Sequence, residues 1–446
     1  MKVFITSKQC GQALPLTLIL LTVTASIVFY VFNTGQLVQE KIGLTNTADA
    51  VAYSAGNFEA RMLNYDAYTN RAMIANEIAI GQAVGLASWA KYASIAGPNL
   101  ARFAQFIPYV GAAIASALRT AGNVSNNILT SKILAISVTA NDLAIQALKN
   151  SQIAVHGSGS SVALANRKRV MDEVAQQNDP DVVVDLLPIS DNFSTFTQHY
   201  TSRDQRKRMG QLVENERKGD DFFKRRNWQF GIFGCPVGLG FKKRGSTEFI
   251  DMVDGWKSMD TLSFHTYRIR RFSCRHRERP IGYGTAFSKN GLNDTGITYA
   301  RSRRDNRRAS AFADSTSGKA AGFAPSSVLK GAIPEFYELS KETLKQDDPR
   351  TQLTIRVSKS DEDQRYSGGA SIIKPTGKLD LYSGQQFKGL SASIARVEVF
   401  FERPDGSNKQ YNKVELGSLF NPYWQVHLLP VSSAERARAA LLQGIR

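Results

Sequence analysis

The residues that could carry enzymatic chemistry are spread thinly along this chain. The five histidines occur singly, at His156, His199, His265, His276 and His427. No two of them have the spacing of a zinc-protease helix. The sequence also has no G-x-S-x-G motif, no phosphate-binding glycine loop and no dinucleotide-binding glycine pattern. We therefore expect a protein that is not an enzyme and that uses no cofactor.

Two loose groups of potential metal ligands deserve separate mention. His265, Cys274 and His276 lie close together in the sequence, beside an arginine-rich stretch, but they match no known ligand spacing. Asp251 and Asp254 could bind a cation, although a turn carrying two solvated carboxylates explains them more simply. We expect no metal site at either place.

The three cysteines suggest one disulfide. Cys10 precedes the most apolar segment of the chain, whereas Cys235 and Cys274 follow far behind it. If the later part of the chain is exported, these two share an oxidising compartment and can pair, while Cys10 stays reduced. Two unrelated thiols remain the alternative, because spacing in the sequence does not show that the two Cα atoms lie close enough for a bridge.

Positive charge is concentrated in residues 201–310. The whole chain has a formal charge of +17, and this region alone holds 25 Lys and Arg against 12 Asp and Glu. Aromatic residues are interleaved with its basic tracts, which suggests an anion-binding surface. The candidate residues are Arg225, Arg226, Lys242, Lys243 and Arg244. In an exported domain the anion would be a lipid headgroup, a cell-wall polymer or an acidic partner, and nucleic acid is not expected; a solvated basic surface without a partner is the alternative.

The segment from Ala13 to Phe32 predicts a transmembrane helix. It contains no charged residue, and 20 residues are enough to cross the hydrocarbon core. Lys2 and Lys8 precede it and no positive cluster follows closely, which places the N-terminus in the cytoplasm. A cleaved signal would have a shorter apolar run and a small-residue site, which Asn33-Thr34-Gly35 matches poorly. A second crossing at Phe103–Leu118 is less favoured, since that run is short and contains a proline and a glycine.

Residues 33–178 have helical periodicity and predict an Ala-rich stalk or bundle. Apolar residues from Leu37 to Tyr65 recur at three- and four-residue spacing, and this stripe could mediate self-association or serve a plain bundle. In a second stripe, Gly81 and Gly85 would permit two helices to approach closely. We expect helix breaks at Gly97-Pro98, near Gly122 and at a Gly157–Ser161 linker.

Residues 179–446 predict a mixed α+β domain. Alternating runs at Leu353–Val357 and Ala395–Phe401 indicate strands. Further expected elements are a turn at Arg403–Gly406, a strand at Tyr411–Leu416 and an apolar run at Val426–Leu429. A closing helix is expected at Ala434–Gln443, capped by Ser432 or Ser433 and with Glu435 in its first turn. The expected organisation is therefore a cytoplasmic N-terminus (1–12), an anchor (13–32), a helical stalk (33–178) and an extracytoplasmic α+β domain (179–446).

Two short stretches resemble a known family. They are Gly11-Gln12-Ala13-Leu14, which leads into the apolar helix, and the later segment Leu44–Ala52. The latter resembles the L-Q-N-A-A-D-A-A-A segment of the TadE/TadG-like proteins of Flp (tight-adherence) pilus assembly. The matching residues are Leu44, Asn46, Ala48, Asp49, Ala50 and Ala52, and Thr45 and Thr47 are among the departures. Together the two stretches cover only residues 11–56.

The resemblance implies a bitopic protein of the bacterial inner membrane, with most of its chain in the periplasm, that acts as a structural component of a pilus assembly or secretion system. Some members are processed after a glycine, for which Gly11–Gln12 is the only candidate, but Leu16 stands where such substrates carry Glu. The family's D-x-S-x-S metal site is not carried over, because Asp314–Gly318 ends in Gly. A membrane-tethered polyanion-binding module is the alternative function.

Overall fold

The structure is a computed structural model. It describes residues 13–441 except 158–159, 186–187, 203, 224–225, 253–254, 289–332, 334, 366–389 and 404–414. The chain divides into two compact units. Unit 1 comprises Met1–Tyr65, Val155–Thr197 and Leu339–Arg446; unit 2 comprises Asp66–Ala154 and Gln198–Glu338. Both units combine helices with sheet, so the mixed helix-and-sheet fold class is confirmed.

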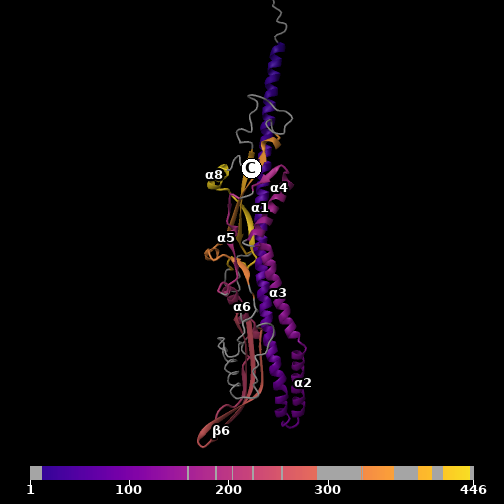
Figure 1. Ribbon diagram of the computed structural model, residues 1–446, viewed down its shortest axis with the longest axis vertical. Coiled ribbons are helices and arrows are strands. Elements are labelled where there is room, and N and C mark those ends of the chain that lie inside the picture. Colours follow the sequence, from indigo (N-terminus) through magenta and orange to yellow (C-terminus); the bar gives the residue numbers. More distant parts are fainter. Residues whose placement is uncertain are drawn as a thin grey trace, which may run out of the picture. The chain divides into compact units, whose positions relative to one another are not determined.

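One helix, α1 (Ala13–Ala104), supplies residues to both units (Figure 1). The predicted end at Gly97-Pro98 is wrong, because the helix continues through Pro98. The predicted break at Gly122 is also wrong, since α2 (Gly111–Thr130) runs through it. A Cβ on Gly122 would lie 2.8 Å from Cδ of Pro98. The missing side chain at Gly122 therefore makes room for the proline ring where α2 packs on α1.

The remaining helices follow in order along the chain. They are α3 (Ile133–His156), α4 (Ser161–Asn178), α5 (Phe193–Phe196), α6 (Lys207–Gly219) and α8 (Ser433–Leu441), with short 3-10 turns at Asp221–Phe223, Thr343–Lys345 and Asp361–Asp363. The expected linker near Gly157–Ser161 is confirmed by the end of α3 and the start of α4. Phe103–Leu118 is not one continuous helix, because α1 ends at Ala104 and α2 begins at Gly111.

Unit 1 is built on an antiparallel sheet whose strand order is β1-β9-β10-β11, with β2 also paired to β9. The strands are β1 (Val182–Val184), β2 (Ser190–Asp191), β9 (Thr351–Ser360), β10 (Leu390–Phe401) and β11 (Trp424–Leu429). The predicted strands at Leu353–Val357 and Ala395–Phe401 are confirmed within β9 and β10, as is the apolar run in β11. The expected turn after Arg403 and most of the strand at Tyr411–Leu416 lie outside the described residues.

The closing helix α8 has the predicted cap. Ser432 Oγ accepts from the backbone N–H of Glu435 at 3.3 Å, while the Glu435 carboxylate accepts from the backbone N–H of Ser432 at 2.9 Å. This reciprocal pair is a capping box. Glu435 also accepts hydrogen bonds from Ser190 and Thr354, so the cap attaches the helix to the sheet of unit 1.

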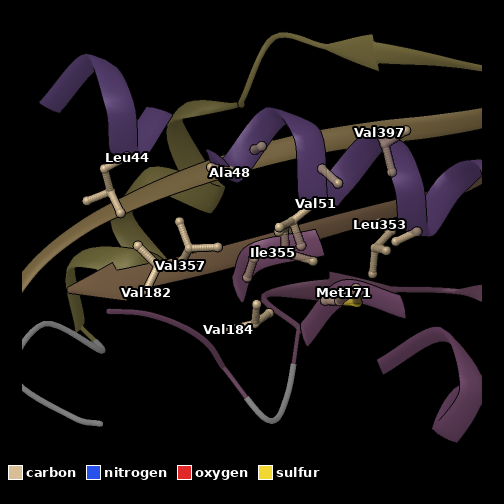
Figure 2. Close-up of a cluster of buried hydrophobic side chains, with 14 residues drawn as sticks. Leu44, Ala48, Val51, Met171, Val182, Val184, Leu353, Ile355, Val357 and Val397 are labelled. Atoms are coloured by element: carbon tan, nitrogen blue, oxygen red, sulfur yellow. The ribbon is translucent and has the colours of Figure 1, made fainter. Parts of the chain in front are cut away.

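Small residues on one face of α1 form the core of unit 1 (Figure 2). Ala48 and Val51 lie over Ile355 of β9, and all three are buried. At Gly56 a Cβ would stand 2.6 Å from the Val426 side chain. The stripe predicted in α1 is therefore buried, but it packs on a sheet within its own unit.

Unit 2 contains a four-stranded antiparallel sheet of order β4-β5-β6-β7 and a two-stranded sheet of β3 and β8. The strands are β3 (Thr197–Tyr200), β4 (Trp228–Gly231), β5 (Val237–Asp251), β6 (Gly255–Arg270), β7 (Ser273–Phe287) and β8 (Phe336–Leu339). The four-stranded sheet packs on α1. The prediction that Gly81 and Gly85 admit a second helix is wrong: a Cβ on Gly81 would lie 2.7 Å from the Trp256 ring, and one on Gly85 would lie 2.8 Å from Phe222 and Thr247.

Candidate functional site

The apolar start of α1 leaves its side chains uncovered. Its most apolar 18-residue window has a mean hydropathy of 2.2, and none of it is buried. Leu18, Leu20 and Val28 are 55%, 66% and 62% exposed. This segment is long and apolar enough to span a membrane. Elsewhere in the described chain, only α2 and α3 taken together are long and apolar enough to do so, and the two helices meet at an angle of 41°.

The Thr and Ser hydroxyl groups in this segment donate hydrogen bonds to backbone carbonyls of the same helix. Thr17 donates to the carbonyl of Leu14 at 2.9 Å, and Ser26 donates to the carbonyl of Thr22 at 2.8 Å. Such internal bonds satisfy these Thr and Ser hydroxyl groups without water. The segment is thus chemically suited to a bilayer.

The family-like segment Leu44–Ala52 serves packing in unit 1. Leu44, Ala48 and Ala52 are buried in the helix–sheet core, whereas Asn46 is exposed. Asp49 and Ala50 are partly buried, and burial raises the pKa of Asp49 above its ordinary value. These matching residues therefore lie on more than one side of α1, and their small members allow β9 and β10 to approach the helix.

A buried ion cluster connects α1 to α4 in unit 1. Arg167 bonds Glu59 at 2.5 Å and also bonds Asp191. Burial raises the pKa of Glu59 to about 7, against the opposing charge of Arg167. One cation is shared by two carboxyl groups, so the cluster holds α1 and α4 together. Oε2 of Glu59 is buried without a hydrogen-bond partner among the described residues.

Two of the five candidate anion-binding residues point into the protein. Lys243 bonds Oδ1 of Asp260 at 2.6 Å, and Arg226 bonds both carboxylate oxygens of Asp260 at 2.9 Å. Ser88 of α1 donates to the same carboxylate at 2.9 Å. Burial favours the neutral form of Asp260, but Lys243 and Arg226 outweigh it and hold the pKa of this carboxyl below its usual range. Arg226 and Lys243 are therefore committed to an internal ion cluster.

The other three candidates do not join them. Arg225 lies outside the described residues. Lys242 and Arg244 flank Lys243 on β5, and since side chains alternate along a strand they face the opposite side of the sheet. Both stand near His265. The structure thus does not assemble the five predicted residues into one surface.

Cys235 and Cys274 form a disulfide in the structure, with Cα atoms 5.9 Å apart. Cys274 is therefore not a free thiolate beside His265 and His276. Those two rings are stacked, and Nδ1 of His265 lies 2.7 Å from Nε2 of His276. Burial lowers the pKa of His265. Within the described ranges, no three His, Cys, Asp or Glu side chains gather as metal ligands.

Several candidates cannot be placed. Gly11–Gln12 and the Asp314–Gly318 stretch lie outside the described residues, as does Asp254 of the candidate cation turn.

Sequence reasoning missed the carboxyl groups that α1 buries in unit 2. Glu77 accepts a 2.8 Å hydrogen bond from the indole of Trp256 and is fully buried. The sequence feature that could have predicted this buried carboxyl group is the acidic residue Glu77 within the apolar face of a long helix, between Ile74 and Gly81.

No family model, curated protein or solved structure matches this chain.

Proposed function

We propose that this protein is a structural component of a Flp-type pilus assembly or secretion system. It is held in the bacterial inner membrane by residues 13–32, and the bulk of its chain lies in the periplasm. Its partners in this proposal are the bilayer, other assembly components and further copies of itself bound through exposed positions of α1.

The observation that carries the proposal is the fully exposed apolar segment of α1. It is continuous with the helix that forms the cores of both units, so one element would join a bilayer to folded structure. Two further observations support it: the segment Leu44–Ala52 packs as part of a helix–sheet scaffold, and the buried ion clusters have structural partners. A disulfide suits an oxidising compartment such as the periplasm.

Gene deletion and complementation in the native cell test the proposal. Surface filaments, counted by electron microscopy, should disappear on deletion and return with the wild-type gene. A Leu20→Arg/Val23→Arg variant should fail to restore them, since each charge at the centre of a span costs about 3 kcal/mol. In cell fractionation Leu20→Arg/Val23→Arg should leave the membrane, whereas a Tyr53→Arg/Tyr68→Arg control, at exposed α1 positions outside the span, should remain associated with it.

Orientation is tested separately with reporters. Alkaline phosphatase fused after Arg446 should be active, and a cytoplasmic reporter at the same position should be dark. Unchanged filament numbers on deletion would refute the assembly role, whereas the reverse reporter pattern would refute only the periplasmic location.

A further inference from the structure

Strands β6 and β7 form a long hairpin (Figure 1). The outer end of this hairpin carries a row of arginines on one face. Side chains alternate along a strand, so Arg268 and Arg270 of β6 share a face. The pairing register places Arg268 opposite Arg275 and Thr266 opposite Arg277, which adds the β7 arginines to that face. The members of this arginine face are Arg268, Arg270, Arg275, Arg277 and Arg279, and all five are exposed.

This arrangement is unfavourable for the isolated hairpin. Like charges directly opposite each other across two strands destabilise the pair, and Arg268 and Arg275 are such a pair. The one carboxylate in this stretch, Glu278, sits opposite His265, on the other face. An anion bound at the face would remove the repulsion, and guanidinium groups suit phosphate because they donate in a planar fork.

Exposed apolar side chains surround the arginines. Val237 and Leu239 of β5 pair with Arg268 and Thr266, so they lie on the same face, and they are 70% and 54% exposed. Phe230 of the neighbouring strand β4 is 74% exposed. The aliphatic Val237 and Leu239 gain nothing against a polar cell-wall polymer, whereas all three apolar side chains gain free energy on entering acyl chains.

The apex of the hairpin departs from ordinary turn chemistry. Its two-residue turn is Arg271-Phe272, with φ of 50° and 62°. Such a turn strongly favours Asn-Gly, because most side chains are strained at positive φ. Phe272 is nevertheless placed there, with its side chain fully exposed. Ile269, three residues before Phe272, is also exposed and lies on the hairpin face opposite the arginines. An aromatic ring at a strained apex, with this apolar residue close by in the chain, has the character of a membrane-inserting tip.

We propose that this hairpin end, comprising the arginine face, Ile269 and Phe272, docks on an anionic lipid surface, with the guanidinium groups on headgroup phosphates and the apex in the interface. The disulfide between Cys235 and Cys274 links the hairpin to the chain before β5 and holds Val237 and Leu239 beside the arginines. This inference does not depend on the proposed pilus role.

The test uses the full chain with its apolar segment inserted in phosphatidylcholine nanodiscs. Binding to sedimenting vesicles is measured for phosphatidylcholine alone and with about 30% phosphatidylglycerol, at about 0.05 M and about 0.5 M salt. Wild type should bind the anionic vesicles at least about tenfold more tightly, and less so at high salt. Arg268→Gln/Arg275→Gln/Arg277→Gln should lose roughly 100-fold at low salt.

Two further variants separate docking from folding and from bulk charge. The matched control Arg169→Gln/Arg436→Gln/Arg438→Gln removes the same charge at exposed positions of α4 and α8 and should stay within about threefold of wild type. Arg271→Asn/Phe272→Gly installs a favoured turn, so it should melt no lower than wild type yet bind anionic vesicles more weakly.

Equal binding to both vesicle types, or an equal loss in the matched control, would overturn the proposal. Ile269→Ser/Phe272→Ser with undiminished binding to anionic vesicles would overturn the insertion of the apex, since the arginine face alone would then account for docking.

Discussion

The indole N–H of Trp256 donates a 2.8 Å hydrogen bond to Oε1 of Glu77, and both side chains are completely buried. The second carboxyl oxygen, Oε2, has no hydrogen-bond partner among the described residues. Burial raises the pKa of Glu77 to about 7; the bond from Trp256 opposes this shift, and the nearby Asp142 adds to it. A carboxyl group in this setting is held largely protonated at mildly acidic pH.

Replacing Glu77 with Gln should stabilise the protein at high pH and change little at low pH. The native state binds more protons than the unfolded chain between the ordinary pKa of 4.5 and about 7, so this group's contribution to stability falls as pH rises through that window. Gln keeps an oxygen for Trp256 and cannot ionise. The gain above about pH 8 should be on the order of 3 kcal/mol.

Denaturant unfolding of Glu77→Gln and wild type at several pH values measures this difference. Glu216→Gln, at an exposed position of α6, is the control and should give a difference that does not vary with pH. The explanation fails if the stability difference between Glu77→Gln and wild type also does not vary with pH.

Gly81→Ala should destabilise unit 2 although alanine favours a helix. A Cβ at Gly81 would lie 2.7 Å from the Trp256 ring, and this fully buried ring has little room to move. We expect a loss of about 1–3 kcal/mol from overpacking. At Gly43, also within α1, a Cβ meets nothing within 4 Å, so Gly43→Ala should stabilise by up to about 1 kcal/mol. The melting temperature should fall for Gly81→Ala and rise for Gly43→Ala. Shifts in the same direction would show that the close approach of Trp256 does not restrict the side chain at position 81.

Asp260→Asn should be severely destabilising. It removes the carboxylate that neutralises Lys243 and Arg226, and it leaves Lys243, which is 4% exposed, as a buried charge. Breaking a buried pair in this way costs about 3–5 kcal/mol. Asp260→Asn/Lys243→Met should recover part of the loss, as judged by urea midpoints. Asp204→Asn, which breaks a solvent-exposed pair with Lys207, should have no measurable effect. An Asp260→Asn loss as small as that of Asp204→Asn would contradict the proposed ion cluster.

Thiol titration should reveal the disulfide directly. The purified, denatured chain contains three cysteines, so one should react without reductant and all three after reduction. A Cys235→Ser/Cys274→Ser variant should show one reactive thiol in both states. Three reactive thiols in unreduced wild type would mean that the bridge does not form in the cell.

Local patterns in the sequence determined the helical character of residues 33–178, though not where all of its helices break, together with the strands within β9 and β10 and the capping box of α8. Each depends on neighbouring residues: apolar spacing, alternation along a strand, and Ser432 three residues before Glu435. That residues 13–32 are long and apolar enough to span a membrane also follows from composition and length alone. These features were therefore predictable without knowing what the segments contact.

Only the tertiary structure decided what these elements pack against and which charges are available. The glycines of α1 indicated a close approach but not that its partner would be the Trp256 ring, because a bare helix face fits a sheet as well as a helix. The sequence pattern indicated that Lys243 and Arg226 were surface cations. In the folded protein both bond Asp260 of β6, which lies 17 residues beyond Lys243 in the sequence. The arginine face likewise depends on the β6–β7 register, since a shift of one residue would move Arg275 and Arg277 to the opposite side.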